Sequence, residues 1–317
     1  MSSTERVNVK NLLDPELRPV LDAFELPAID AEGVAAMRSA SFASPDLSDA
    51  VVRIEHEVPG DPPVPVRVHR AKDAQGLLPA IVTIHGGGYV IGSYDMDSPL
   101  LDRWCPALDV VGVSVEYRLA PETSYPGPLE DCYAALRWTY EHAHKLGIDK
   151  DRIGLYGLSA GGGLAAALAL LARDRGEVPL AFVLLDCPML DDRQHTPSIN
   201  AEGLYVWGPG SNEFGWRSYL GALYGSDEVP AYAAPARAAD LTRLPPTCVI
   251  VGSIDGFRDE DIDYAQRLNQ AGVACELHVI AGLPHAYQLV PGAAAVQLAM
   301  HCMDDWLTRQ LAGRPSG

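Results

Sequence analysis

Short apolar runs alternate with helical segments over most of this 317-residue chain, and this alternation limits the possible folds more than any other feature. The runs PAIVTI (79–84) and VVGVSV (110–115) are continuously apolar, as expected of strands buried on both faces of a parallel sheet. Segments of helical periodicity follow several of these runs. The pattern predicts an α/β fold with a mostly parallel, doubly wound central sheet and helices on both faces.

The same patterns place the individual elements. Strands are expected within residues 51–60, 64–71, 79–88, 110–118, 152–157, 180–188, 246–255 and 275–282. The first two alternate polar and apolar residues, which is typical of an antiparallel edge. Helices are expected from Pro128 to Gly147 and over residues 159–176, 263–272 and 293–312.

Two further helices are expected before the first strand. Asp14 and Pro15 have the residue types of an N-cap and a first helical position. A helical stripe follows them at Leu17, Val20, Leu21 and Phe24. A second helix is expected over Asp30–Ser41, and both helices form an N-terminal attachment to the sheet.

The strand–helix alternation stops between about residues 190 and 240, where an aromatic-rich segment carries one helix. The apolar face of that helix holds Trp216, Tyr219, Leu220 and Leu223. Such an insertion follows a core strand, at the sheet edge where ligands bind in α/β folds. We therefore predict N-terminal cap helices at 1–48, a catalytic core at 49–189 and 241–317, and a cap insertion at 190–240.

Charge and cysteine content exclude several function classes. With 24 Lys+Arg against 42 Asp+Glu, the net charge of −18 argues against nucleic-acid and anionic-membrane partners. The N-terminus has no apolar signal core, and no apolar run is long enough to span a bilayer. The six cysteines form no C-x-x-C pair and lack metal-type His spacing. We predict free thiols, no metal and a cytoplasmic location.

The sequence GLSAG (157–161) matches G-x-S-x-G between a predicted strand and a predicted helix. This context is typical of a nucleophile elbow, in which Ser159 has a strained backbone and projects above the sheet. A phosphate loop needs a lysine after its glycines, and none follows here. A purely structural serine at a glycine-rich helix start is the remaining alternative.

A second glycine motif, HGGG at 85–88, lies at the end of the apolar strand at 79–84, upstream of the elbow. HGGG is the oxyanion motif of lipases and esterases, because successive glycines let backbone N–H groups converge on a developing negative charge. We interpret His85 as a structural histidine that holds this loop. The two motifs in this order favour acyl transfer.

A triad then needs an acid and a histidine further along the chain. Of the four downstream histidines, His285 lies in a Gly/Pro turn just beyond a strand, and we select it. Asp255 directly follows another strand and is our choice for the acid, with Asp259 as the alternative. The acidic residues after Asp255 suit a helix N-terminus, and they lack calcium-loop spacing.

The ordered motifs now identify a resemblance. HGGG at 85–88, SVEYRLAPE at 114–122, GLSAGG at 157–162, DGFRDE at 255–260 and the His285 loop resemble the bacterial hormone-sensitive-lipase-like esterases of the α/β-hydrolases. DDRQHTPS at 191–198 is similar to the start of that family's cap. The resemblance implies a carboxylesterase for short to medium acyl esters, with no cofactor and often a homodimer.

Carried over to this chain, the resemblance implies three catalytic residues: Ser159 as nucleophile, His285 as general base and acid, and Asp255 as its partner. It further implies an oxyanion hole built from the N–H groups of Gly87, Gly88 and Ala160. Glu116 and Arg118 fall in the family's structural signature and are expected to be scaffold.

This chain also departs from the family pattern. Leu158 stands where an acid usually precedes the serine, Ala286 replaces a common glycine, and Asp97-Ser98 replaces a His-Asp pair. The substrate pocket is expected to involve the aromatic residues of the insertion, which could equally anchor the cap: Tyr205, Trp207 and Phe214. Two other functions fit the sequence, a non-catalytic ligand-binding protein of the same fold and an acyltransferase or amidase with the same triad.

Overall fold

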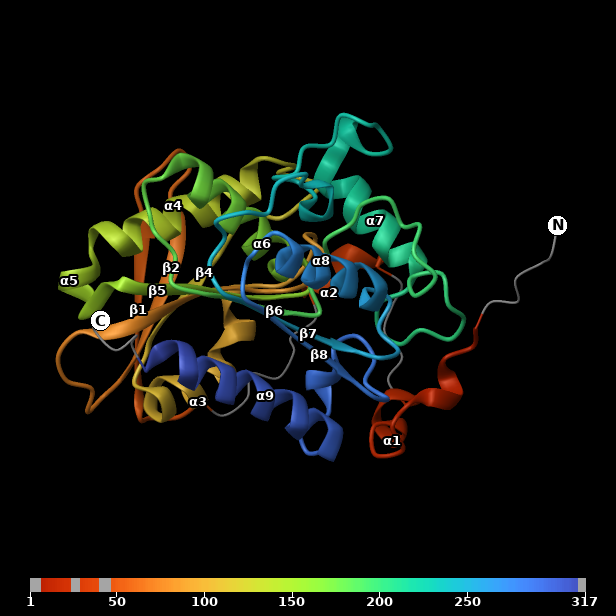
Figure 1. Ribbon diagram of the computed structural model, residues 1–317, viewed down its shortest axis with the longest axis horizontal. Coiled ribbons are helices and arrows are strands. Elements are labelled where there is room, and N and C mark those ends of the chain that lie inside the picture. The colour runs from red at the N-terminus through yellow and green to blue at the C-terminus, as the bar shows by residue number, and fades with distance from the viewer. Residues whose placement is uncertain (1–6, 24–28, 40–46, 313–317) are drawn as a thin grey trace.

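The computed structural model describes residues 7–23, 29–39 and 47–312. Within these residues an eight-stranded sheet crosses the centre of the molecule, with helices on both faces (Figure 1). The strand order is β1-β2-β4-β3-β5-β6-β7-β8. β2 pairs antiparallel with both β1 and β4, and the other neighbours are parallel. The predicted α/β-hydrolase architecture is confirmed.

Every predicted strand is present. The strands are β1 (Val51–Val58), β2 (Val64–Ala71), β3 (Leu78–Ile84), β4 (Val111–Val115), β5 (Ile148–Leu158), β6 (Val183–Asp186), β7 (Thr247–Gly252) and β8 (Cys275–Ile280). The α-helices are α1 (Arg18–Leu21), α2 (Gly33–Ser39), α3 (Ser98–Leu108), α4 (Gly127–Glu141), α5 (Ala143–Leu146), α6 (Ala160–Arg175), α7 (Pro209–Leu220), α8 (Arg258–Gln270) and α9 (Ala294–Leu311).

Among the described residues, two apolar cores lie on opposite faces of the sheet. Helices α4, α6 and α8 cover one face, and α3 and α9 cover the other (Figure 1). Every residue of β4, β6 and β7 is buried, because these strands have helices above and below them. This burial on both faces explains why the strands are continuously apolar in the sequence. It also holds the carboxyl ends of the parallel strands, where the loops begin, in fixed positions.

Several helix predictions need correction. The single helix predicted from Pro128 to Gly147 is broken into α4 and α5 at His142, which leaves the helical conformation (φ −102°, ψ 8°). Gly147 ends the second piece in the left-handed conformation, as predicted. Helix α3 was not predicted, and it contains Pro106, a residue that usually interrupts helices. Helix α8 begins at Arg258, before the predicted start at residue 263.

The N-terminal helices are shorter than predicted. Helix α1 has only four residues, and of the predicted stripe Leu17 and Leu21 are buried while Val20 is exposed. Helix α2 lies within the predicted second helix, and the Asp30 carboxylate accepts hydrogen bonds from the N–H groups of Glu32 and Gly33 at its start. Phe24 of the stripe, and residues 40–41 of the second helix, lie outside the described residues.

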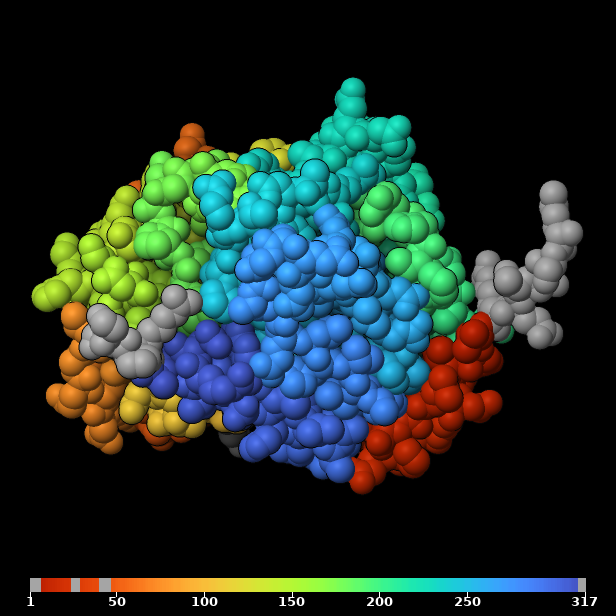
Figure 2. All heavy atoms as spheres, in the orientation of Figure 1, coloured from red at the N-terminus to blue at the C-terminus, as the bar shows by residue number. Residues whose placement is uncertain are grey.

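The insertion between β6 and β7 contacts the N-terminal segment. Figure 2 shows residues 190–225, in green to teal, and the red N-terminal segment at the same end of the molecule. Main-chain hydrogen bonds join Glu202 to Val7 and Val9 (3.0 and 2.9 Å), and the Tyr205 hydroxyl donates to Asp22 (3.1 Å). The predicted face of the insertion helix is inward, with Trp216, Tyr219 and Leu220 buried and Leu223 half-buried.

Two further expectations concern the cysteines and the membrane. All six thiols are free, and four of them are buried among apolar side chains. Among the helices of the described residues, none combines the length and hydropathy that crossing a membrane requires.

Candidate active site

Ser159 lies on a sharp turn between strand β5, which ends at Leu158, and helix α6, which begins at Ala160. Its backbone dihedrals, φ 56° and ψ −120°, are rare for a residue with a side chain. The turn brings α6 close under strand β3, since a Cβ on Gly161 would lie only 2.0 Å from the Ile84 carbonyl oxygen. The geometry is that of a nucleophile elbow.

A continuous chain of hydrogen bonds joins Ser159, His285 and Asp255. The Ser159 Oγ lies 2.9 Å from His285 Nε2, and His285 Nδ1 lies 2.8 Å from Asp255 Oδ2. Because a carboxylate only accepts, Nδ1 carries the proton and the free Nε2 lone pair faces the serine. All three side chains are at most 5% exposed. This arrangement allows a proton to move from Ser159 to His285 beside a buried negative charge.

Asp255 is itself fixed by its surroundings. Its second oxygen, Oδ1, accepts the Phe257 N–H at 2.9 Å. The Phe257 ring then packs edge-on against the His285 imidazole, with 5.0 Å between ring centroids. The carboxylate and the imidazole are thus held by the same turn before α8.

The alternative acid and the other histidines are engaged elsewhere. Asp259 accepts the Ser198 N–H at 2.8 Å and pairs with Arg258. His278 contacts Glu276 on strand β8. His195 lies 3.7 Å from Asp191, and His301 is exposed on α9. Of the histidines and acids considered from the sequence, the structure brings together His285 and Asp255.

The HGGG loop lies beside the elbow. A Cβ on Gly86 would lie 3.3 Å from the Ser159 Cβ, which places the loop against the serine. Gly87 and Gly88 have positive φ (114° and 60°), so this path favours glycine. Within the described residues, no hydrogen bond uses the N–H of Gly87, Gly88 or Ala160 as donor. These groups are available to an oxyanion formed at Ser159.

His85 supports this loop from below. Its ring stacks on Tyr117 with centroids 4.2 Å apart, and its Nδ1 lies 2.8 Å from the Gly86 carbonyl oxygen. The Tyr117 hydroxyl donates to the His85 carbonyl (2.9 Å). Burial lowers the pKa of His85 to about 4, so the ring is neutral at physiological pH. These contacts agree with the structural role expected for His85.

The three aromatic residues of the insertion occupy different places. The Trp207 ring lies against the HGGG loop, since a Cβ on Gly88 would lie 2.0 Å from its Cη2, and 6.3 Å separates its centroid from that of His285. The Tyr205 hydroxyl instead points to Asp22 of the N-terminal segment. Phe214 is half-buried against the core under α4 and α6. Of the three, Trp207 lies beside the Ser159–His285 pair.

Sequence reasoning missed several buried acids near this site, Glu260 and Asp186 among them. Glu260, assigned only to a helix N-terminus, accepts the N–H groups of Leu190 and Asp191 at 2.8 and 3.1 Å. Burial raises the pKa of Glu260 well above its usual value. Asp186, at the end of β6, is fully buried as well. A charged residue at the end of the apolar run LAFVLLD was the signal that could have drawn attention to Asp186.

The signature residues are scaffold, as expected. Arg118 forms a two-pronged ion pair with the buried Asp131, with N···O distances of 2.7 and 2.8 Å. Glu116 accepts the Tyr94 N–H (2.7 Å). Both contacts tie the loop after β4 to its neighbours.

The departures from the family pattern also have structural consequences. Leu158 packs half-buried against the core on the α3 and α9 side. Ala286 has a left-handed backbone (φ 56°), a conformation in which glycine is unstrained and alanine is not. Asp97 is buried just before α3, and burial raises its pKa to about 7.

One group of potential metal ligands occurs among the described residues, formed by Cys187, Asp255 and His285 with ligand atoms within 4.8 Å of one another. Both ring nitrogens of His285 already form hydrogen bonds, to Ser159 and to Asp255. A metal ion at this group would replace those bonds. The donor set therefore fits a triad with a neighbouring thiol better than a resident metal centre.

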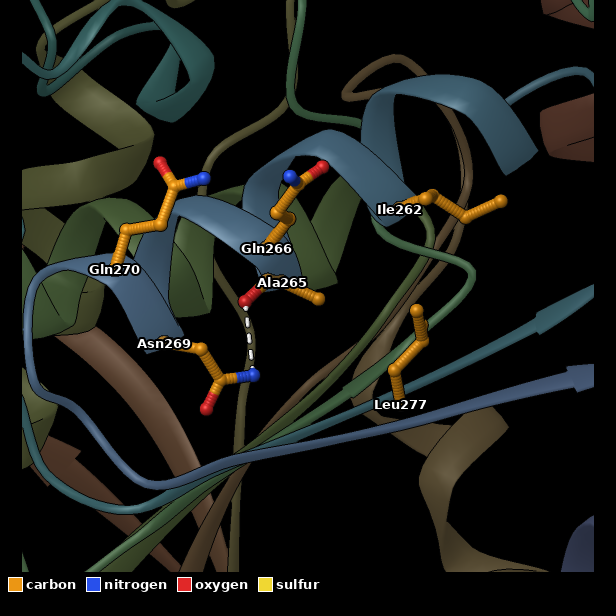
Figure 3. A pocket seen from close by; sticks show the side chains of 6 residues that line it. All are labelled: Ile262, Ala265, Gln266, Asn269, Gln270 and Leu277. Carbon is orange, nitrogen blue, oxygen red and sulfur yellow. Dashed lines mark hydrogen bonds between the residues drawn. The ribbon is translucent and has the colours of Figure 1, made fainter.

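A shallow groove lies elsewhere on the molecule, between helix α8 and strand β8 (Figure 3). Its lining consists of Ile262, Ala265, Gln266, Asn269, Gln270 and Leu277. Asn269 donates its side-chain N–H to the Ala265 carbonyl within the same helix (3.3 Å). None of these residues contacts Ser159, so the groove is separate from the candidate site.

Known proteins share both sequence and structure with this chain. A family model described as alpha/beta hydrolase fold matches residues 81–289. Carboxylesterase NlhH of Mycobacterium tuberculosis is 36% identical over 305 residues, covering 92% of this chain and 95% of that protein. Esterase LipI of the same species is 35% identical over 288 residues, covering 88% of each chain. The solved structure of a bacterial heroin esterase matches with a TM-score of 0.91 at 42% identity, over 95% of this chain and 98% of that one.

Proposed function

Because this chain belongs to the hormone-sensitive-lipase-like esterase branch of the α/β-hydrolase family and is a carboxylesterase, we propose that Ser159, His285 and Asp255 carry out its ester hydrolysis. Its substrates are esters. The observation that carries the assignment of residues is the hydrogen-bonded chain from Ser159 Oγ through His285 to Asp255, at 2.9 and 2.8 Å. Among the residues that the structure describes, the nearby N–H groups of Gly87, Gly88 and Ala160 donate to no acceptor.

In the first half of the proposed mechanism, Ser159 Oγ attacks the ester carbonyl carbon while His285 Nε2 takes the hydroxyl proton. Asp255 stabilises the imidazolium that forms. The N–H groups of Gly87, Gly88 and Ala160 bind the oxyanion, and each such donor contributes about 10²–10³ in kcat in comparable sites. The imidazolium then protonates the departing alkoxide, and an acyl-enzyme remains.

In the second half, water attacks the acyl carbon and His285 accepts its proton. The second tetrahedral intermediate uses the same oxyanion hole. Its collapse breaks the bond to Ser159 Oγ, which is reprotonated by His285, and releases the carboxylic acid. The chemistry of this cycle is supplied by side chains and main-chain N–H groups, and we propose that it needs no cofactor.

We further propose that the enzyme prefers short to medium acyl chains and that Trp207 sets the limit. The indole lies against Gly88, within reach of the His285 ring, and is only 4% exposed. Its Nε1–H donates to Asn212 Oδ1 (3.2 Å), and Asn212 donates in turn to Gln194 (3.0 Å), so the ring is held in place. A fixed aromatic wall beside the oxyanion loop restricts the space for an acyl group. Tyr205 and Phe214 remain proposed contributors to the pocket.

We propose that residues 1–48 and 190–240 act together as a cap over this site. The main-chain hydrogen bonds between Glu202 and the segment Val7–Val9 support a joint unit, as does the Tyr205–Asp22 bond. Such a cap excludes water, which strengthens the hydrogen bonds to the oxyanion and the ion pair between His285 and Asp255.

A series of p-nitrophenyl esters from acetate to decanoate tests the function and the acyl preference together. An accommodated methylene contributes about 0.8 kcal/mol, close to a fourfold gain in kcat/KM. We expect kcat/KM to rise over the first members and then fall once the chain meets Trp207. Trp207→Leu should move the maximum to longer chains, whereas Trp138→Leu on α4 should leave it in place. A Ser159→Ala variant with undiminished turnover, or a Trp207→Leu profile equal to the wild type, would contradict the proposal.

We also propose an oligomeric state and a cellular location. We propose strand β8 as the interface of a homodimer. It is the last strand of the sheet and, among the described strands, pairs only with β7. Two copies related by a twofold axis could pair along this edge. Sedimentation analysis distinguishes a dimer from a monomer. Cell fractionation tests the proposed cytoplasmic location.

A further inference from the structure

Asp186 occupies the end of strand β6, directly beside the nucleophile elbow. In the parallel register it pairs with Leu158 of β5, the residue before Ser159. Its main-chain carbonyl accepts the Ser159 N–H at 2.8 Å. Its side chain is completely buried. Side chains at paired positions lie on the same face of a sheet, so the Asp186 carboxylate lies on the face that carries Leu158.

Four donors from three parts of the chain surround this carboxylate. Tyr287 donates its hydroxyl to Oδ1 at 2.8 Å, and the Cys187 thiol lies 3.4 Å from the same oxygen. Gln288 donates Nε2–H to Oδ2 at 2.6 Å, and the Tyr156 hydroxyl donates to Oδ2 at 3.2 Å. Among the described residues no arginine, lysine or histidine donates to it. Burial raises the pKa of Asp186 to about 6, while the hydrogen bonds from its donors oppose that shift.

Two of those donors belong to the loop that carries the candidate base. Tyr287 and Gln288 form the short 3₁₀ helix Tyr287–Leu289, which begins two residues after His285. Ala286, which lies between His285 and Tyr287, has the unfavourable left-handed backbone. A loop with this local strain keeps its path only when contacts outside it hold it. The carboxylate of Asp186 supplies two such contacts.

We propose that Asp186 is a positioning residue for the proposed hydrolysis, fixing the His285 loop against the elbow so that Nε2 stays within hydrogen-bonding distance of Ser159. The carbonyl of Asp186 holds the serine side of that contact, and its carboxylate holds the histidine side. The proposal rests on the triad described above. It also accounts for a departure from the family pattern, because the acid that is missing at Leu158 has a counterpart at the paired position on β6.

The contact between Asp186 and Gln288 can be broken and rebuilt with isosteric changes. Gln288→Glu places a second carboxylate at the present 2.6 Å contact, where two like charges cannot both remain ionised without moving apart. In the double variant D186N/Q288E the pair is reversed, because the asparagine amide donates to the glutamate. D186N alone can keep the contact, because a turn of the Gln288 amide lets its oxygen accept a hydrogen bond from the asparagine. Gln266→Glu on the exposed side of α8 makes the same change of residue without this contact.

Two readouts follow the position of His285. The first is kcat and KM per fluorophosphonate-titrated active site: Q288E should lose about 10²-fold in kcat, the effect of a misplacement near 1 Å, with KM changed less than about threefold. The second is the low-field proton resonance of the His285–Asp255 hydrogen bond, which needs no turnover. It should broaden or shift in Q288E. D186N/Q288E should recover most of the kcat and the resonance, and Q266E should match the wild type.

The outcomes separate this inference from the proposed function. If Q288E keeps the kcat and the resonance of the wild type, or if D186N/Q288E is as impaired as Q288E in both, Asp186 does not position His285. If the wild type itself shows no turnover, the proposed function fails. In that case the low-field proton resonance of the His285–Asp255 hydrogen bond still shows whether Asp186 positions His285.

Discussion

Substituting Gly88 by alanine tests whether the Trp207 indole closes over the loop that supplies the oxyanion N–H groups. Gly88 has φ 60°, and a Cβ there would lie 2.0 Å from Cη2 and 2.7 Å from Cζ2 of Trp207. Carbon atoms in ordinary contact lie about 3.5–4.0 Å apart. The methyl group therefore overlaps the ring by about 1.5 Å, and either the ring or the loop has to move.

The expected cost has two parts. Alanine in the left-handed conformation loses about 1–2 kcal/mol relative to an ordinary backbone. Forcing a methyl group into a filled space adds about 1–3 kcal/mol. The free energy of unfolding should therefore fall by about 2–5 kcal/mol. If the loop shifts, one oxyanion donor is misplaced, and kcat/KM for p-nitrophenyl acetate should fall about 10²–10³-fold.

The assay is a double-mutant cycle with Gly88→Ala, Trp207→Ala and both changes, followed by urea unfolding and by esterase kinetics. Removing the indole removes the overlap but leaves the backbone strain, so the two changes should couple favourably by about 1–3 kcal/mol. Gly210→Ala serves as control, since a Cβ at that position of α7 meets nothing within 4 Å. A Gly88→Ala variant as stable and active as the wild type, or additive effects in the cycle, would refute the reasoning.

Three further predictions address other parts of the account. Ala286→Gly relieves the strain of the positive φ in the His285 loop and should raise the free energy of unfolding by about 0.5–1 kcal/mol, because the strain relieved exceeds the entropic cost of a glycine. The urea midpoint should rise accordingly at constant m-value. A lower midpoint would contradict the assigned strain. Because burial raises the pKa of Glu260, the folded state holds more protons than the unfolded state above pH 4.5, and the stability of the wild type falls as pH rises. The stability of Glu260→Gln relative to the wild type should therefore increase with pH. A difference that stays constant with pH would show that folding does not raise the pKa of Glu260. A thiol reagent should modify at most Cys275 and Cys302 in the native protein, and all six cysteines in denaturant.

The central strands of the sheet could be predicted because they are buried on both faces. Such strands have continuously apolar sequences, and β3, β4 and β7 each coincide with one of these apolar runs. The helices were predicted less well because their limits depend on local exceptions. His142 breaks the helix between α4 and α5, and Pro106 hides α3.

Those residues of the candidate site that belong to sequence motifs could be predicted. The elbow and the HGGG loop have fixed spacing, and their order along the chain led to Asp255 and His285. The supporting contacts had no such signal, because they join distant segments. Asp186 meets Tyr287 across 101 positions of sequence, and Glu260 meets Leu190 across 70. Only the fold brings these acids to the loops they hold.

The location of the nucleophile is the central claim, and peptide mass mapping after fluorophosphonate treatment tests it most directly. The account predicts one covalent adduct, on Ser159, with p-nitrophenyl acetate turnover lost in proportion to labelling. The Ser159→Ala protein should keep its fold and take up no label. An adduct on another residue, or full turnover in a protein completely labelled at Ser159, would contradict the account.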